Sequence, residues 1–163
     1  MKTKNVLIAG LGGQGIILCS RIICNVLFEK GYDIKKSEVH GMSQRGGSVT
    51  SQICFGKIVY SPLIPERGID FLLMLDENEG ARHKENLSEG GIILGLSPEE
   101  KSKLKSKKCV NVAVAAKFLK SIGVAMQEIE RALRNFVKEK FILMNMETVA
   151  QVYSTEKREL YEI

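Results

Sequence analysis

The sequence predicts an α/β fold in which one mixed sheet carries helices on both faces. Strand-sized apolar runs alternate with helical patterns, a glycine-rich turn links the first strand to the first helix, and the last third reads as helical. The chain has 163 residues, which is enough for one buried core and too few for two ordinary domains. We therefore expect residues 1–163 to form a single domain.

The first predicted unit is a strand, a helix and a second strand. Residues 4–9 form an apolar run that ends in glycine, as a buried parallel strand does. Apolar side chains then recur at helical spacing from Ile16 to about Lys30, and Gly31 is placed to end that helix. Residues 32–39 return as a strand, and such a connection is almost always right-handed between parallel strands.

The middle of the chain predicts a hairpin and then a buried strand. Residues 48–55 and 58–61 read as the two arms of the hairpin, with the turn residues Gly56-Lys57 between them. Prolines stiffen the connection that follows, and Ile69 to Leu75 is an apolar run of strand length.

Helices dominate the rest of the sequence. Asp76 and Glu77 suit a helix start, so we expect a helix to about Leu87 and then a strand at 92–96. The residues Ser97-Pro98-Glu99-Glu100 combine an N-cap, a proline in the first turn and two acids, which predicts another helix start. One face of a later helix is apolar at Met126, Ile129, Leu133, Phe136 and Val137.

Composition narrows the class of protein. Hydrophobic residues make up 44% and charged residues 26%, as in soluble globular proteins, and no apolar run approaches the roughly 20 residues that span a bilayer. The polar start of the chain shows no pattern of a cleavable signal, so we expect a cytoplasmic protein without a membrane partner. Four cysteines without CxxC spacing, and no nearby histidine, predict no metal site and no iron–sulfur cluster on this chain.

The net charge of +5 does not indicate nucleic-acid binding. Basic residues are scattered, and the densest group, from Lys101 to Lys108, reads as a solvated loop without aromatic neighbours. Only 6% of the chain is aromatic and there is no tryptophan, whereas proteins that stack bases interleave basic and aromatic residues. A mildly basic surface suits an acidic partner such as a ferredoxin or a coenzyme A phosphate.

The first candidate site is the G-x-G-x-x-G turn between the first strand and helix. Its glycines would let the backbone approach a diphosphate at the helix N-terminus, and Glu38, at the end of the second strand, stands near where a ribose-binding acid would lie. Alternatively, the glycines only let the helix pack close to the sheet. The candidate residues of the turn are Gly10, Gly12, Gly13, Gln14 and Gly15.

The second candidate site is the polar loop that follows the second strand. Because ligands of open α/β sheets bind at the carboxyl ends of strands, this loop and the first glycine turn could share one crevice. Arg45 could grip a phosphate or carboxylate with two hydrogen bonds, or it could pair with an acid on a partner protein. We assign no catalytic residue, since a lone histidine more often orients backbone than acts as a base. The candidate residues are His40, Ser43, Gln44, Arg45, Gly46 and Gly47.

These segments together resemble a known family. GLGGQG, SEVHGMSQRGGSV, YSPLIP and IDFLLMLDENEGAR are similar to the gamma-type small subunit of 2-oxoacid:ferredoxin oxidoreductases, with the beta subunit of indolepyruvate:ferredoxin oxidoreductase as the closest form. The resemblance covers roughly Val6 to Asn145. Asp70 and the stretch from Glu77 to Arg82 match the family's acid and helix start, and Asn111 and Asn145 stand where the family tends to place asparagines.

The resemblance implies a three-layer α/β/α fold with a mixed, mostly parallel sheet. It also implies that thiamine diphosphate and iron–sulfur clusters belong to a larger alpha subunit, and that this chain binds no cofactor alone. The assembled enzyme would oxidatively decarboxylate an aryl 2-oxoacid to an acyl-coenzyme A and reduce ferredoxin. This subunit would support the active-site cleft and help to seat coenzyme A or the substrate, and it could form a homodimer in isolation.

Two alternatives come from other classes of protein. A stand-alone NAD- or FAD-binding oxidoreductase would use the glycine turn and Glu38, although the predicted hairpin interrupts the strand–helix–strand order that such a fold continues. An adenylate-forming activating protein of the ubiquitin-activating type also has a glycine-rich loop after its first strand. That class needs a longer chain and zinc-spaced or nucleophilic cysteines.

Overall fold

The sheet is mixed, as predicted, and its central strand is the first one. The computed structural model describes residues 2–41 and 46–154. The sheet order is β2-β3-β1-β4-β5, with β1 parallel to β4, β4 parallel to β5, and β3 antiparallel to both β1 and β2. The strands are β1 (Lys4–Leu11), β2 (Asp33–His40), β3 (Ser48–Gly56), β4 (Ile69–Met74) and β5 (Leu87–Gly95).

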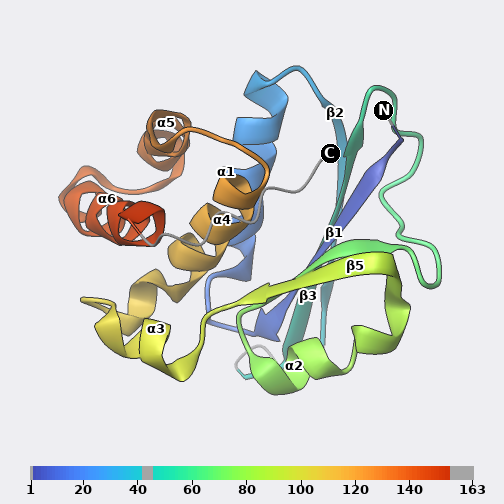
Figure 1. Cartoon of the computed structure of the whole chain (residues 1–163), viewed down its shortest axis with the longest axis horizontal. Helices are drawn as coiled ribbons and strands as arrows, with labels where there is room; N and C mark the ends of the chain where they lie inside the picture. Colours follow the sequence, from blue (N-terminus) through green and yellow to red (C-terminus); the bar gives the residue numbers. More distant parts are fainter. Residues whose placement is uncertain (1, 42–45, 155–163) are drawn as a thin grey trace.

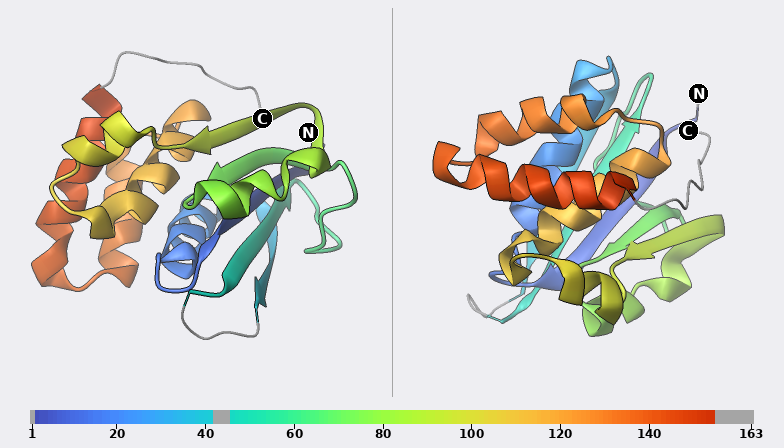
Figure 2. Two further views of the ribbon diagram at one scale, coloured as in Figure 1. Left: turned by 90° about the horizontal axis from the view of Figure 1, so that it is seen from below. Right: turned by 60° about the vertical axis from the view of Figure 1, so that its left-hand side comes forward.

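The helices are divided unequally between the two faces of the sheet. Four of them, α1, α4, α5 and α6, gather on one side, whereas α2 lies apart from them beside the sheet (Figures 1 and 2). The helices are α1 (Ile16–Glu29), α2 (Glu77–Ala81), α3 (Pro98–Lys103), α4 (Val110–Ser121), α5 (Met126–Phe136) and α6 (Glu139–Ser154), with 3₁₀ turns η1 (Lys84–Asn86) and η2 (Lys107–Cys109).

The main core lies between the sheet and the four-helix side. Val6 and Ile8 of β1 point into it. The rings of Phe71 on β4 and Phe118 on α4 pack edge to face there, with 5.1 Å between the ring centroids. The opposite side chains of β1, Leu7 and Ala9, belong to a smaller cluster on the other face. A central strand buried on both faces needs a continuous apolar run, which is what the sequence has there.

The smaller cluster is covered thinly. Ile64, from the segment that follows β3, packs against it, and Met74 of β4 lies against Gly80 of α2. A side chain at Gly80 would collide with Met74, so α2 approaches the sheet closely there. The result is the expected three-layer α/β/α arrangement, with a thick helical layer on one face and a thin one on the other.

This arrangement creates a switch in direction between β1 and β4. The chain leaves β1 toward α1 on the thick side and leaves β4 toward α2 on the thin side. Adjacent parallel strands whose connections diverge in this way open a crevice at their carboxyl ends, where open α/β sheets bind ligands.

The predicted hairpin is wrong in its second arm. β3 pairs with β2 on one side and β1 on the other, and residues 58–61 form no strand. Backbone N–H groups bond to side chains instead, both in this segment, where Val59 donates to Asp33 at 2.8 Å, and just after it, where Ile64 donates to Gln52 at 3.0 Å. Because both edges of β3 are already occupied, a returning strand has no place to pair.

The helix predicted to run to about Leu87 is also too long. Asp76 caps α2 as expected, by accepting from the N–H groups of Asn78 and Glu79, but α2 ends at Ala81. A glycine within so short a helix lowers its stability. β5 then begins at Leu87 rather than at 92, and its register shifts where β4 passes from Ile69 to Phe71.

Other predicted boundaries are confirmed. Gly31 follows α1 with a φ of 85°, which a glycine adopts without strain. Ser97 caps α3 in a capping box, accepting from the N–H of Glu100 while the Glu100 carboxylate accepts from the N–H of Ser97 at 2.7 Å. Among residues 2–41 and 46–154, no helix is long and apolar enough to cross a membrane.

Candidate functional site

The glycine turn is held by its own glutamine. The Gln14 Oε1 atom accepts a hydrogen bond from the Leu11 N–H at 2.8 Å, and a β-carbon at Gly10 would lie 2.7 Å from that oxygen. Gly13 and Gly15 have φ values of 95° and 80°, which favour glycine. These three glycines are therefore required by the turn itself, whatever it binds.

The two glycine-bearing loops meet. The N–H of Gly12 donates to the carbonyl of Gly47 at 2.8 Å, next to the pairing of Leu11 with Ser48. Gly46 has a φ of 71°. The predicted site residues Ser43, Gln44 and Arg45 lie outside the described residues.

Glu38 and His40 lie on β2, which β3 separates from β1. The Glu38 carboxylate accepts from Lys36 at 2.7 Å and lies 3.8 Å from His40 Nε2. The hydrogen bond from Lys36 lowers the pKa of Glu38 despite its partial burial. Two strand spacings, about 10 Å, stand between β2 and β1, so Glu38 is not beside the glycine turn as it would be in a dinucleotide-binding fold.

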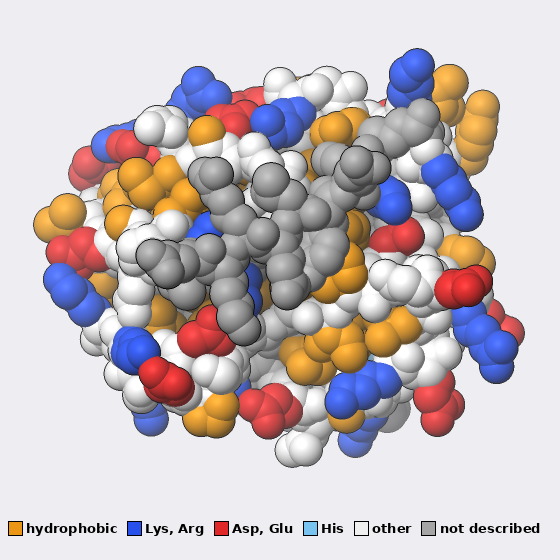
Figure 3. Space-filling view, viewed as in Figure 1, with side chains coloured by type: hydrophobic (Ala, Val, Ile, Leu, Met, Phe, Trp, Pro, Cys, Tyr) orange, Lys and Arg blue, Asp and Glu red, His pale blue; other side chains and the backbone are white. Residues whose placement is uncertain are grey.

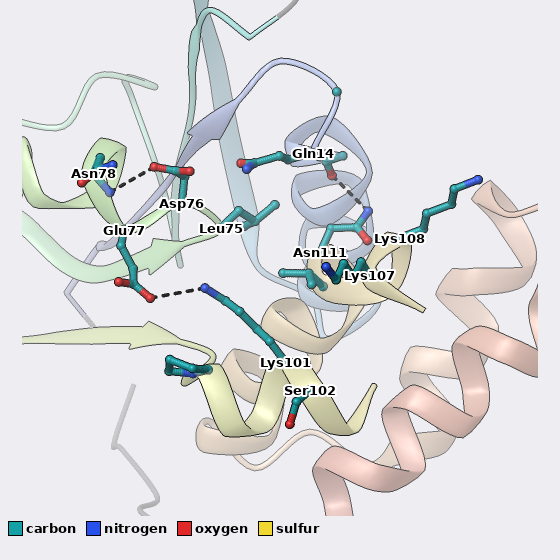
Figure 4. Close-up of a pocket in the computed structure, with 14 residues that line it drawn as sticks. Gln14, Leu75, Asp76, Glu77, Asn78, Lys101, Ser102, Lys107, Lys108 and Asn111 are labelled. Atoms are coloured by element: carbon teal, nitrogen blue, oxygen red, sulfur yellow. Dashed lines mark hydrogen bonds and ion pairs between the residues drawn. The ribbon is translucent and has the colours of Figure 1, made fainter. Parts of the chain in front are cut away.

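A cleft of about 1050 Å³ opens at the switch between β1 and β4. Its walls are the glycine turn (residues 13–15), the segment 75–78 after β4, the start of α3 and the segment 107–111 that begins α4. The cleft adjoins the first predicted site, whereas none of the described residues of the second loop lines it. Figure 4 shows Gln14 and Asn111 on one wall and the Lys101 side chain reaching across to Glu77, where the ion pair measures 3.3 Å.

The cleft wall carries charges of both signs, since Lys101, Lys107 and Lys108 line it together with Asp76 and Glu77. The helices α1 and α4, of 14 and 12 residues, both begin at it, and neither has an acid in its first turn. The α1 start has no side-chain cap, so its N–H groups and the helix dipole favour an anion there. The α4 start differs, because η2 runs directly into it: the Ser106 hydroxyl caps η2, and the Val110 N–H donates to the Lys107 carbonyl. Lys107 and Lys108 stand exposed at the rim. The lysine-rich segment from Lys101 to Lys108 was predicted as a loop, but part of it is helical: Lys101 lies in α3 and Lys107 in η2.

Asn111 joins the two helix starts. Its Nδ2 donates to the Gly15 carbonyl at 3.2 Å, and a β-carbon at Gly15 would collide with the Asn111 amide. The residue is only 5% exposed, and its Oδ1 atom has no hydrogen-bond donor within the described part of the chain. Residue patterns alone could not place Asn111 at the glycine turn, because 96 positions separate it from Gly15.

Charged side chains are scattered over the surface, as the sequence predicted for the basic residues. Figure 3 shows acidic and basic side chains interspersed around one face, with apolar patches between them. All four cysteines are free, and burial raises the pKa of Cys24 to about 11. Among the residues described, no group of three or more His, Cys, Asp and Glu side chains could hold a metal ion.

Comparison with known proteins gives the family. The sequence model described as "Pyruvate ferredoxin/flavodoxin oxidoreductase" matches residues 5–155. The chain belongs to the pyruvate ferredoxin/flavodoxin oxidoreductase family. Among curated family relatives, the indolepyruvate oxidoreductase subunit IorB of Thermococcus kodakarensis is 39% identical over 93 residues, which are 57% of this chain and 46% of the relative. The match thus spans about half the length of that relative.

Solved structures confirm the fold of this pyruvate ferredoxin/flavodoxin oxidoreductase chain. The gamma subunit of a keto/oxoacid ferredoxin oxidoreductase from Geobacter sulfurreducens aligns with a TM-score of 0.72 and 20% identity, covering 92% of this chain and 96% of that one. A 2-oxoglutarate:ferredoxin oxidoreductase from Magnetococcus marinus, solved with 2-oxoglutarate, coenzyme A and succinyl-CoA bound, aligns with a TM-score of 0.81 and 13% identity, covering all of this chain and 33% of that one. At these identities the likeness concerns the fold. The family predicted from the sequence motifs is confirmed, and nothing supports the stand-alone dinucleotide-binding alternative.

Proposed function

We propose that this chain is the gamma-type subunit of a 2-oxoacid:ferredoxin oxidoreductase and that it forms one domain of that assembly. The enzyme would decarboxylate a 2-oxoacid oxidatively, form an acyl-coenzyme A and pass two electrons to ferredoxin. An aryl pyruvate such as indolepyruvate is the proposed substrate, because the curated relatives carry that name. Thiamine diphosphate and iron–sulfur clusters would reside on a larger partner subunit, and the assembly would work in the cytoplasm.

Within that assembly, the cleft between β1 and β4 would seat the phosphate-bearing part of coenzyme A. The observation that carries this proposal is that the α1 N-terminus, which has no side-chain cap and no acid in its first turn, opens on the same cleft as the exposed side chains of Lys107 and Lys108. The chemistry of the donor set fits the group: backbone N–H groups and lysine ammonium groups donate hydrogen bonds, and phosphate oxygens only accept them. Coenzyme A supplies the thiol that leaves as the thioester, while this chain binds and orients its phosphates.

The assembly is tested by co-purification from the native host. We expect a larger subunit with bound thiamine diphosphate and iron–sulfur clusters to accompany this chain, and the complex to reduce ferredoxin only when both a 2-oxoacid and coenzyme A are present. Comparing indolepyruvate with pyruvate and 2-oxoglutarate identifies the substrate. Tightly bound flavin, or NAD reduction by the isolated chain, would overturn the proposal.

The seat for coenzyme A is tested by titration calorimetry. Replacing Lys107 or Lys108 by alanine should weaken coenzyme A binding several-fold. The difference in affinity should be smaller at high salt, because salt screens exposed charges. Lys57 offers a matched control, because it follows the end of β3 that is far from the glycine turn. Equal losses for Lys57→Ala and the two rim variants would show that only net charge matters.

A further inference from the structure

The strand β2 is an open edge of the sheet. It pairs with β3 in an unbroken register from Asp33 to His40, and no other strand of the described chain lies beyond it. Its outer edge therefore presents backbone N–H and C=O groups along a regular strand, and such an edge is a template for pairing with another chain. The opposite edge of the sheet is less suitable, because the register of β5 shifts against β4 and Gly90 has a φ of 76°.

The side chains of β2 alternate between the two faces of the sheet. Lys36 stands opposite Ile53, a residue of the main core, so Lys36 and Glu38 point to the four-helix side and Ser37 points to the other. The side chains of Lys36 and Glu38 are 30% and 22% exposed and bind each other at 2.7 Å. The edge thus carries one charge of each sign, two residues apart, on the same face.

A second copy of β2 fits this edge in one register. Two copies related by a two-fold axis perpendicular to the sheet pair antiparallel, and facing residues share a face, so the axis passes through a residue. With the axis at Ser37, Lys36 of each copy faces Glu38 of the other. An axis at Lys35 or Lys36 sets two lysines against each other, and an axis at Glu38 sets two carboxylates against each other. An axis nearer either end of the strand leaves at most three residues paired.

The helix beside β2 adds apolar surface to the same edge. Cys24 of α1 lies near Lys36 and Glu38, whose charges affect the pKa of its thiol. Ile17 and Phe28 share a helical stripe with Cys24, and their side chains are 36% and 70% exposed. A perpendicular two-fold axis would place the two copies of α1 on the same side of the joined sheet, with these stripes facing each other.

We propose that β2 is an interaction surface for a second copy of this chain, and that the two sheets join edge to edge across an axis at Ser37. The two ion pairs between Lys36 and Glu38 select the register. Lysines on an exposed edge discourage pairing in other registers, as they do in many sheet proteins. One strand of eight residues from each copy makes a small interface, so we expect a reversible, concentration-dependent dimer. The proposal concerns a different part of the sheet from the cleft and does not depend on the proposed function.

A disulfide trap tests the register. Facing Cα atoms of antiparallel strands lie about 4.5–5.5 Å apart, within the roughly 4.4–6.8 Å that a disulfide joins. Mild oxidation should therefore convert Ser37→Cys to a covalent dimer. Val39→Cys is the matched control, because residue 39 lies on the same face and is more exposed, but its two copies would stand at least about 13 Å apart. The unaltered protein supplies the blank, since three of its four cysteines are buried.

Sedimentation velocity with charge variants tests the ion pairs. Lys36→Glu sets carboxylates against each other and Glu38→Lys sets ammonium groups against each other, so each variant should weaken self-association about tenfold or more. An equimolar mixture restores opposite charges in a mixed dimer and should recover the association. Recovery would also show that both variants fold. Lys84→Glu and Glu85→Lys make the same charge changes at exposed positions of η1 and should leave the self-association unchanged.

Four results would overturn the proposal. They are a monomer at the highest soluble concentration, equal cross-linking of the two cysteine variants, a mixture that associates no better than its components, and loss of association in the η1 controls as well. Cross-linking of Ser37→Cys to the larger subunit in the co-purified complex would assign this edge to that partner and would overturn the proposal too. Failure of coenzyme A to bind the cleft would leave the dimer untouched, so the two proposals fail separately.

Discussion

The N–H of Gly12 lies 2.8 Å from the carbonyl of Gly47, and this hydrogen bond joins two loops that are 35 residues apart in the sequence (47 − 12 = 35). It extends the antiparallel pairing of β1 and β3 by one step beyond Leu11 and Ser48. The glycine turn is thereby fixed at the end of the sheet on one side, while Asn111 fixes it on the other.

Hydrogen exchange should detect this bond directly. We expect the amide of Gly12 to exchange at least tenfold more slowly than that of Gly13, which is exposed at the tip of the turn. Amide exchange followed by NMR measures both in one sample. Equal rates would mean that the two loops separate freely in solution.

Alanine substitutions at Gly15 and Gly13 should differ in cost. Both glycines have positive φ, which costs an alanine about 1–2 kcal/mol. Only at Gly15 would the new β-carbon also collide with Asn111, whereas at Gly13 nothing lies within 4 Å. In urea unfolding, Gly15→Ala should therefore lower the free energy of unfolding more than Gly13→Ala does, by about 1 kcal/mol or more. A Gly13→Ala variant with the greater loss would contradict this account of the turn.

The stability of the protein should fall in acid partly through Glu128. The Ala125 N–H, which donates to its carboxylate at 2.8 Å, and Lys30, at 2.9 Å, hold the pKa of Glu128 below its usual value. A carboxyl group with a lowered folded pKa stabilises the protein above its unfolded pKa of about 4.3, and this stabilisation disappears as the pH falls through the folded value.

Glu128→Gln should thus lower the free energy of unfolding by about 0.5–1 kcal/mol at pH 7, and the difference from the unaltered protein should shrink as the pH falls below about 4.3 and vanish once the pH is below the folded pKa of Glu128. Glu85→Gln, at an exposed carboxylate on η1, serves as the control and should have little effect at either pH. A Glu128→Gln deficit that stays the same size as the pH falls below about 4.3 would point to lost packing rather than lost charge.

The thiols should be slow to react in the folded protein. With a pKa of about 11, Cys24 is about 0.1% thiolate at pH 8, against roughly a quarter for an ordinary cysteine. The other three cysteines are buried. Labelling with a thiol reagent such as DTNB at pH 8 should be at least a hundredfold slower in buffer than in denaturant. One rapidly labelled thiol under native conditions would contradict this.

Local patterns predicted much of the fold because they depend on neighbouring residues. The apolar run at 4–9, the helical spacing after Ile16 and the capping sequence at Ser97 each identify an element without knowledge of the rest. The family motifs added the three-layer architecture. The burial of β1 on both faces could also be predicted from neighbouring residues, because the side chains that point to either face are apolar.

Pairing between distant segments could not be read in this way. The placement of β3 between β1 and β2 depends on contacts across the chain. The predicted hairpin was therefore right in its first arm, 48–55, and wrong in its second, 58–61, which forms no strand. The cleft escaped prediction for a similar reason. It needs the start of α4 beside the glycine turn, and only the family resemblance drew attention to Asn111. Glu38 was predicted at the end of the second strand and His40 in the loop that follows it. Both lie on β2, and an intervening strand separates them from the glycine turn.

The central place of β1 sets the order of events during synthesis. Its neighbours in the sheet are β3, which begins at Ser48, and β4, which ends at Met74. At about 5–20 residues per second, translation needs roughly 3–13 s to advance from the end of β1 to the end of β4. Throughout that time this strand, which is buried on both faces in the folded protein, lacks at least one of its two neighbours. A nascent chain of this protein is therefore expected to engage a ribosome-associated chaperone through its first dozen residues.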